Sequence, residues 1–252
     1  RAWKEECRLV QRTAGRGTFV PLAFAPGEAF QFDWSEEFAV IGSTRTKLQV
    51  AHSKLCHSRA FIVRAYLLQT HEMLFDAHNH AFRVFGGIPG RGIYDNMRTA
   101  IDKVGRGKER DINVRFQAMA SHYLFEPEFC NRAAGWEKGI VEKNVQDRRR
   151  QIGVELGQRH WSSLAELNAW LASECRAAWD TMAHPEWPEL MIAEVWENEQ
   201  PQLMPAPQPF DGYLELPVRV SGTALIHFQR NRYSVPTEAA HRVISLRVYP
   251  FE

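Results

Sequence analysis

Apolar and polar side chains alternate in the first extended part of the chain. Aromatic residues alternate with polar ones over residues 29–40, which is the two-residue period of a β-strand. Residues 47–53 and 60–68 are the next strand candidates. Because short connections join the three segments, the pattern predicts an antiparallel meander.

From residue 71 the apolar period becomes that of a helix. Large apolar side chains recur at helical spacing over residues 71–86, and Gly86 followed by Gly87 predicts the end of this helix. The further elements that the pattern predicts are, in chain order, a strand over 92–94, a loop over 102–111, a helix over 113–122, a strand over 123–125, and helices over 137–152 and 163–179. This order of strands and helices predicts a mixed α/β layer.

Composition changes after residue 187 and divides the chain further. Five prolines punctuate the stretch that follows, so we expect a Pro-rich, acidic linker over residues 188–210. Residues 211–252 return to a strand pattern and predict a small β-module that stops in mid-strand. Residues 1–22 are basic and Gly-punctuated, and are expected to connect a preceding region to a catalytic domain over residues 23–187.

Charge is unevenly distributed along a chain of 252 residues whose formal net charge is only +1. Residues 98–115 and 138–150 each carry a local charge of +3, whereas residues 176–215 carry −7. Four cysteines without a CxxC pair are typical of reduced thiols in the cytoplasm. No apolar run is long enough to span a membrane, and we expect the chain to be a fragment of a longer protein.

Three acidic residues occupy positions where a carboxylate is unusual. Asp33 lies in mid-strand between two aromatic residues, although an ionised carboxylate beside an apolar sheet is costly without a cation. Asp95 directly follows a short predicted strand, and Glu142 lies on a predicted helix whose same face carries Lys138 and Arg149. Each acid alone also fits a structural role, as a surface acid, a helix cap or one half of a surface ion pair.

The segments around these acids resemble the three signature segments of the DDE transposase and retroviral-integrase superfamily. They are residues 27–34 (GEAFQFDW), 94–100 (YDNMRTA) and 138–144 (KGIVEKN). More closely, they resemble the IstA-type transposases of bacterial insertion sequences. Residues 230–236 (RNRYSVP) are similar to the β-module that follows the catalytic domain in that family, and the resemblance covers roughly residues 20–250.

The resemblance implies an RNase H-like fold, with a mixed five-stranded sheet flanked by helices and followed by a small β-barrel module. It implies that Asp33, Asp95 and Glu142 are catalytic and hold two Mg²⁺ or Mn²⁺ ions about 4 Å apart, for cleavage at transposon ends and 3′-OH strand transfer into target DNA. The residues expected to surround this site are Lys138, Lys143 and Arg149 as DNA phosphate contacts, and Asn96 and Gln31 as supports of the metal ligands.

The same resemblance implies partners and a place in the cell. Proteins of this type act on transposon-end and target DNA as homo-oligomers, with an AAA+ ATPase as helper. They also carry helix-turn-helix DNA-binding domains before the catalytic core. We therefore expect a bacterial cytoplasmic protein that associates with the nucleoid when it acts, and no membrane partner.

Three other functions fit parts of the sequence. An RNase H-like nuclease would cut without joining, and a non-catalytic DNA-binding or assembly domain would keep the fold without binding metal. A glycosidase using Asp33 and Asp95 would leave Glu142 and the basic segments without a role. The run His78-Asn79-His80 matches a nuclease motif only by its letters, since it falls within a predicted amphipathic helix.

A zinc site is a further possibility that the sequence raises. His52, Cys56 and His57 are close in the chain, and such side chains bind zinc in many proteins. Because no second pair follows at finger-like spacing, the pattern favours ordinary structural roles for these three residues.

Overall fold

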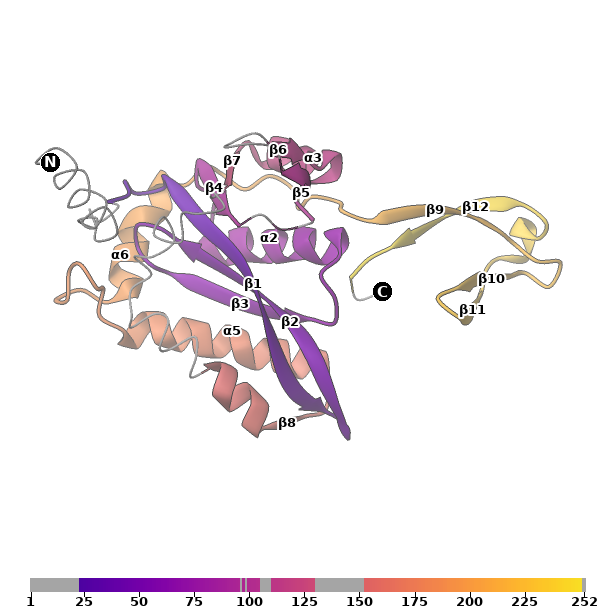
Figure 1. Cartoon of the computed structure of the whole chain (residues 1–252), viewed down its shortest axis with the longest axis horizontal. Helices are drawn as coiled ribbons and strands as arrows, with labels where there is room; N and C mark the ends of the chain where they lie inside the picture. Colours follow the sequence, from indigo (N-terminus) through magenta and orange to yellow (C-terminus); the bar gives the residue numbers. More distant parts are fainter. Residues whose placement is uncertain (1–22, 96, 98, 105–109, 130–151, 251–252) are drawn as a thin grey trace, which may run out of the picture.

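A computed structural model describes residues 23–95, 97, 99–104, 110–129 and 152–250. A sheet flanked by helices forms the larger part of the molecule, and the strands nearest the C-terminus project away from it (Figure 1). None of the helices in the described ranges is both long and apolar enough to cross a lipid bilayer.

The central sheet is mixed, and its first three strands are the predicted meander. Strands β1 (Ala29–Ile41), β2 (Thr44–Leu55) and β3 (Phe61–Tyr66) pair antiparallel in sequence order. Strands β4 (Arg91–Tyr94) and β7 (Glu126–Phe129) then extend the sheet on the other side of β1, parallel to it. The resulting order is β3-β2-β1-β4-β7, and a short β8 (His160–Trp161) adds a parallel pairing at the far end of β1. The long β1 is therefore the centre of the sheet.

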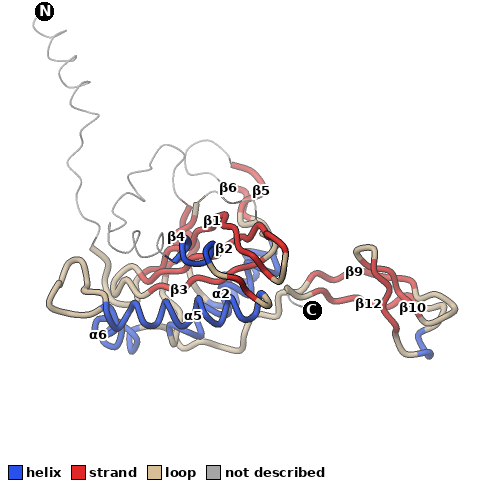
Figure 2. Tube along the Cα trace, turned by 90° about the horizontal axis from the view of Figure 1, so that it is seen from below, coloured by secondary structure: helices blue, strands red, loops and turns tan. Residues whose placement is uncertain are grey.

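Two long helices lie on the same side of this sheet, α2 (His71–Phe85) and α5 (Leu164–Thr181), as Figure 2 shows. Helix α2 ends at Gly86, whose φ of 80° is the left-handed conformation that glycine adopts readily. Helix α5 covers the edge strand β3: the Asn168 side chain accepts from the Ala65 N–H (2.7 Å) and donates to the Ala65 carbonyl (3.0 Å). The outward backbone N–H and carbonyl of Ala65 on this edge strand are thereby satisfied.

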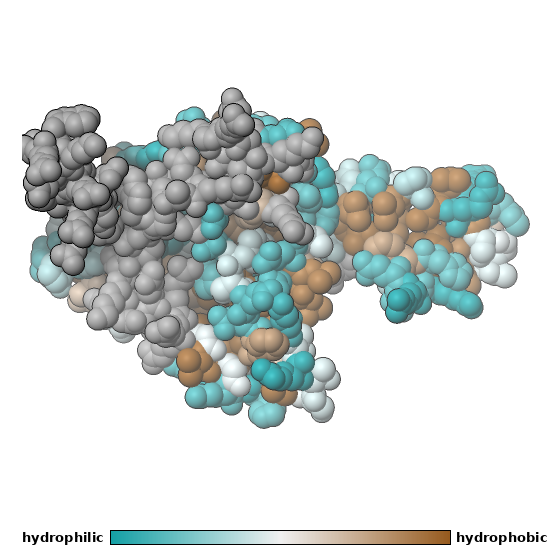
Figure 3. Space-filling view, in the orientation of Figure 1, coloured by the Kyte–Doolittle hydropathy of each residue, from teal (hydrophilic) through white to brown (hydrophobic). Residues whose placement is uncertain are grey.

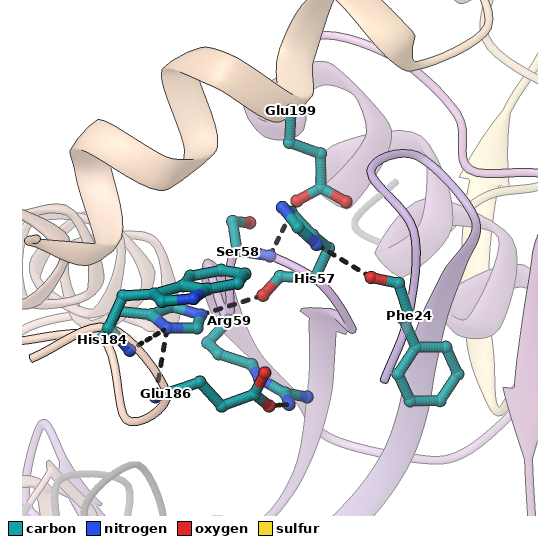
Figure 4. A network of polar contacts seen from close by, with 8 residues as sticks. Phe24, His57, Ser58, Arg59, His184, Glu186 and Glu199 are labelled. Carbon is teal, nitrogen blue, oxygen red and sulfur yellow. Dashed lines mark hydrogen bonds and ion pairs between the residues drawn. The ribbon is translucent and has the colours of Figure 1, made fainter. Parts of the chain in front are cut away.

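The beginning of β1 is fixed by a buried carboxylate at the end of helix α6 (Ile192–Glu199). Glu199 is fully buried, and its two oxygens accept hydrogen bonds from the backbone N–H groups of Gly27 (3.0 Å) and Ser58 (2.9 Å). Figure 4 shows Glu199 reaching the turn between β2 and β3. A carboxylate that accepts from two backbone donors is stabilised in a buried position. This contact joins the entry to β1, the β2–β3 turn and α6.

A second set of contacts surrounds that turn. The His57 ring bonds the Phe24 carbonyl (2.8 Å), and the His184 ring bonds the His57 carbonyl (3.0 Å) (Figure 4). Buried Arg59 forms an ion pair with Glu186 at 2.5 Å. Burial lowers the pKa of His184, so it stays neutral near pH 7. The segment after α5 is thus part of the folded core.

Several elements differ from the sequence-based expectation. Within residues 102–111, expected as a loop, β5 (Ile101–Val104) and β6 (Arg110–Ile112) form an antiparallel pair. Helix α3 (Val114–Tyr123) ends at Leu124, whose φ of 61° interrupts the helix. The strand expected over 123–125 therefore begins only at β7. Short-range periodicity gave no indication of either feature.

The stretch expected as a linker over residues 188–210 contains α6 and the 3-10 turn η1 (Gln200–Gln202). The extended part after η1 follows the surface of α2 and α3. Phe210 packs edge-on against Phe75, and the Asn79 side chain donates to the Phe210 carbonyl (2.9 Å). Apolar and hydrogen-bonded contacts thus attach the stretch expected as a linker to the core.

The projecting module consists of two separate two-stranded sheets. Strand β9 (Leu214–Arg219) pairs with β12 (Val243–Val248), and β10 (Leu225–Phe228) pairs with β11 (Asn231–Ser234), with a turn η2 (Thr237–Ala239) between them. Among the described residues these strands do not close into the expected barrel. Hydrophobic residues are visible at the surface of this module in the space-filling view (Figure 3).

Candidate carboxylate site at the ends of β1 and β4

The parallel pairing of β1 with β4 brings Asp33 and Asp95 side by side. The last paired residues of the two strands are Phe32 and Tyr94, and each acid is the next residue of its own strand. Neighbouring strands lie about 4.8 Å apart, so two residues that are 62 positions apart in the sequence become neighbours. The spatial meeting of these two acids, which the sequence alone did not require, follows from strand register.

Asp33 lies on the face of the sheet opposite α2, and Asp95 follows directly where β4 ends. The Phe32 ring contacts His78 of α2, and side chains of successive strand residues point to opposite faces. Asp33 and Asp95 are both exposed. The backbone N–H of Trp34 donates to Asp33 Oδ1 at 3.0 Å, which orients that carboxylate. The two acids are therefore backbone neighbours, and both are accessible to solvent.

Polar side chains surround Asp33 on the same face. Gln31 lies two residues before it on β1, as expected for a residue flanking the site. His52 of β2 is directly opposite Asp33 in the antiparallel ladder, and its Nε2 lies 2.7 Å from the Ser35 hydroxyl oxygen. No pattern in the sequence indicated His52 and Ser35 as neighbours of the site, because their proximity to Asp33 depends on the β1–β2 register.

Beneath the two acids lies a buried aromatic layer centred on His78. Its ring is fully buried, and burial lowers the pKa of His78 to about 4. Its two nitrogens lie 2.8 Å from the Leu74 carbonyl and 2.9 Å from the Tyr94 hydroxyl. His78 is therefore a neutral core residue. The run His78-Asn79-His80 lies within helix α2 and does not form a nuclease site there. The position of His78 on the apolar face of α2 was the signal for burial in the sequence.

The other expected site residues lie outside the described part of the chain. They are Asn96, Lys138, Glu142, Lys143 and Arg149. Within the described ranges, no three His, Cys, Asp or Glu side chains are grouped closely enough to hold a metal ion. This finding includes the zinc candidates His52, Cys56 and His57, and burial raises the pKa of the Cys56 thiol to about 12. Burial therefore keeps this thiol protonated near pH 7.

Sequence comparisons find relatives along almost the whole chain. A transposase of Aminobacter aminovorans is 66% identical over 250 residues, which are 99% of this chain and 49% of that protein. The transposase for insertion sequences IS1326/IS1353 of Pseudomonas aeruginosa is 56% identical over 249 residues, 99% of this chain and 48% of that protein. The chain thus spans about half the length of these relatives. Residues 204–252 match the family "Mu transposase, C-terminal domain".

Solved structures with a similar fold include retroviral integrases. The catalytic core domain of HTLV-2 integrase, in complex with magnesium, aligns with a TM-score of 0.50 and 12% identity over 69% of this chain and 99% of that one. A simian T-cell lymphotropic virus intasome structure aligns with a TM-score of 0.54 and 9% identity over 89% of this chain and 81% of that one. These neighbours show that the core has the RNase H-like fold of integrase catalytic domains. The chain belongs to the DDE transposase and retroviral-integrase superfamily, and its sequence relatives are insertion-sequence transposases.

Proposed function

We propose that this chain is the catalytic core of a DNA transposase, which cleaves transposon ends and joins the 3′-OH to target DNA. The observation that carries the proposal is the register of β1 and β4, which makes Asp33 and Asp95 backbone neighbours that are both accessible to solvent. Its sequence relatives are named as transposases, which supports the same conclusion.

The donor set at this position suits a hard divalent cation. Asp33 and Asp95 offer carboxylate oxygens, which Mg²⁺ and Mn²⁺ prefer, and the fold neighbour from HTLV-2 was solved in complex with magnesium. A pair of such ions, when bound, supplies activation of the attacking oxygen and stabilisation of the leaving oxygen. The contribution of the chain is to hold Asp33 within β1 and Asp95 directly after β4, at positions that DNA can reach.

Glu142 would complete the set from the helix that the sequence predicts over residues 137–152. Its place in residues 138–144, the third of the segments that resemble the signature segments of the superfamily, supports this role, and Glu142 itself lies outside the described residues.

The remaining roles follow from this arrangement. Lys138, Lys143 and Arg149 would contact DNA phosphates from the same helix, because the local charge of +3 over residues 138–150 favours a polyanion. Gln31, which shares the face of Asp33, and Asn96, which follows Asp95, would support the ligands.

The partners proposed for the whole protein are those of its superfamily. They are transposon-end and target DNA, further copies of the same chain, and an AAA+ ATPase helper. The bacterial transposases among its relatives support action on DNA in the bacterial cytoplasm. Because this chain spans about half of those relatives, recognition of specific ends would need the remaining regions as well.

The proposal is tested by strand transfer with pre-cleaved terminal DNA of the encoding insertion sequence, using the protein with its natural flanking regions. Asp33→Asn, Asp95→Asn and Glu142→Gln should each lower product formation at least about a hundredfold, because several kcal/mol of charge stabilisation are lost. Asp180→Asn, at an exposed position of α5, is the matched control and should retain activity. Cleavage without joining would indicate a hydrolytic nuclease, and unaltered behaviour of Asp33→Asn would indicate a non-catalytic domain.

A further inference from the structure

The backbone pairing of β1 with β4 stops one residue before the two acids. Phe32 and Tyr94 form the last pair of the ladder, and β4 itself ends at Tyr94. Beyond this pair Asp33 stays in the ladder with His52 of β2, whereas the Asp95 backbone leaves the sheet and its carbonyl accepts from the Met97 N–H at 2.8 Å. Phe32 and Tyr94, which immediately precede the acids, are therefore the last residues at which β1 and β4 are joined.

His78 contacts both of those preceding residues. Its ring stacks on the Phe32 ring, with centroids 4.5 Å apart and planes inclined by 25°. Its Nε2 lies 2.9 Å from the Tyr94 hydroxyl. The rings of Phe32 and Tyr94 are themselves 6.0 Å apart, so His78 bridges the two strand ends from below.

The hydrogen bonds of His78 allow only one arrangement of protons. The Leu74 carbonyl can only accept, so His78 Nδ1 carries the proton and donates to it at 2.8 Å. In a neutral ring Nε2 is then an acceptor, and the Tyr94 hydroxyl must donate to it. Burial favours this neutral ring and also raises the pKa of Tyr94, which keeps the hydroxyl protonated. Both rings are consequently locked in orientation.

Packing alone does not require a histidine at this position. The neighbours of His78 include Phe30, Phe82 and Phe125, among which a phenylalanine would fill similar space without the cost of burying a polar ring. The two directional bonds are what the imidazole adds. One is anchored in the backbone of α2, and the other ends on the residue before Asp95.

We infer that His78 is a positioning residue that, together with the Tyr94 hydroxyl, sets the separation of Asp33 and Asp95 for divalent-cation binding. This inference rests on the proposed metal-dependent function. Metal ligands held by hydrogen-bonded supports lose affinity when the support is removed, even though the support does not touch the ion. The role of His78 is thus exerted through Phe32 and Tyr94 and not through contact with substrate.

The test measures Mn²⁺ affinity of the chain by calorimetric titration at a temperature where every variant is folded. Tyr94→Phe removes only the hydroxyl, and His78→Phe keeps an aromatic ring but removes both hydrogen bonds. Each should weaken Mn²⁺ binding by about tenfold to a hundredfold. Tyr123→Phe is the matched control: its hydroxyl also bonds within this region, to Asn79 and the Phe210 N–H, but does not contact Phe32 or Tyr94.

The control distinguishes positioning from a general loss of stability. Tyr123→Phe should leave Mn²⁺ affinity within about twofold of the unaltered chain, and equal weakening by this variant would overturn the inference. So would unaltered affinity in both Tyr94→Phe and His78→Phe. Asp33→Asn distinguishes failure of the proposed metal site from failure of the role of His78. If this variant binds Mn²⁺ like the unaltered chain, the proposed metal site is wrong. If it loses binding, the Tyr94→Phe and His78→Phe variants decide the role of His78.

A second measurement needs no metal. In ¹⁵N spectra of the apo chain, the His78 ring should show a protonated Nδ1 and a hydrogen-bonded, unprotonated Nε2. Tyr94→Phe should shift the Nε2 resonance alone, whereas Tyr123→Phe should leave it in place. An Nε2-protonated ring in the unaltered chain would contradict the proposed locking of the strand ends.

Discussion

The strand ends that carry Asp33 and Asp95 and the strands of the projecting module differ in how they are supported. Phe32 and Tyr94, next to the acids, are almost completely buried, and a layer of aromatic rings from α2 lies against them. In β9 and β12 every residue is exposed or half-exposed, although the same two-residue alternation runs through both strands. Identical periodicity thus supports a rigid site in one region and a thin, solvated sheet in the other.

The physical difference is the number of layers. The central sheet has helices packed against it, so Phe30 and Phe32 of β1, which face α2, are removed from water. The module has only a few buried side chains, among them Val220, Ala224 and Ile226. Two-stranded sheets without a packed partner are marginally stable. We therefore expect stability to be concentrated near the carboxylates and to be low in the module.

The largest effect should follow from Phe30→Ala in the core. Phe30 is fully buried and contacts four rings, those of His78, Phe82, Tyr94 and Phe125. Removing a buried phenylalanine side chain costs about 3–5 kcal/mol, because transfer energy is lost and a cavity remains. Urea unfolding followed by tryptophan fluorescence measures the change. A loss below about 1 kcal/mol would show that the aromatic layer is not the stable centre of the molecule.

The next effect is the response of the same layer to acid. Because the folded-state pKa of His78 is about 4, below the value near 6.5 of a free histidine, the unfolded chain takes up this proton first as pH falls. Above pH 6.5 the neutral His78 ring does not reduce the free energy of unfolding. Between pH 6.5 and about 4 its preference for the neutral form lowers the free energy of unfolding by up to about 3 kcal/mol.

Burial also lowers the pKa of His80 to about 4, so the comparison needs a variant. The free energy of unfolding, measured by urea titration at several pH values, should fall less steeply between pH 6.5 and 4 in His78→Phe than in the unaltered chain. Equal slopes in the two proteins would contradict the assignment of the proton to His78.

The smallest effect should come from Leu246→Ala in β12. Leu246 pairs with Leu216 of β9 and is only half-buried. Truncating its side chain therefore removes little buried apolar surface. We expect a cost of about 1 kcal/mol or less. Hydrogen exchange should report faster opening of the β9 and β12 amides, while the unfolding midpoint of the core stays unaltered. A shift of the core midpoint would show that module and core unfold as one unit.

Much of the core was predictable from local sequence patterns. The meander, α2 with its glycine end, and the helix over most of α5 follow from period and caps, since these depend on residues a few positions apart. Helix α6 was not predicted, because prolines around it indicated a linker, and its stability depends on contacts such as those of Glu199 with Gly27 and Ser58. The β5–β6 pair was missed because its segment is rich in charged residues and glycine, a composition that indicated a loop.

The sequence by itself determined the order of the meander strands, α2 and α5, and singled out Asp33 and Asp95 as acids in unusual positions. Only the tertiary structure decided that these two acids are neighbours, that His52 lies opposite Asp33, and that His78 belongs to the core beneath them. Period and composition report which face of an element is apolar. Strand order and register, which set every one of these contacts, arise from the packing of segments far apart in the chain.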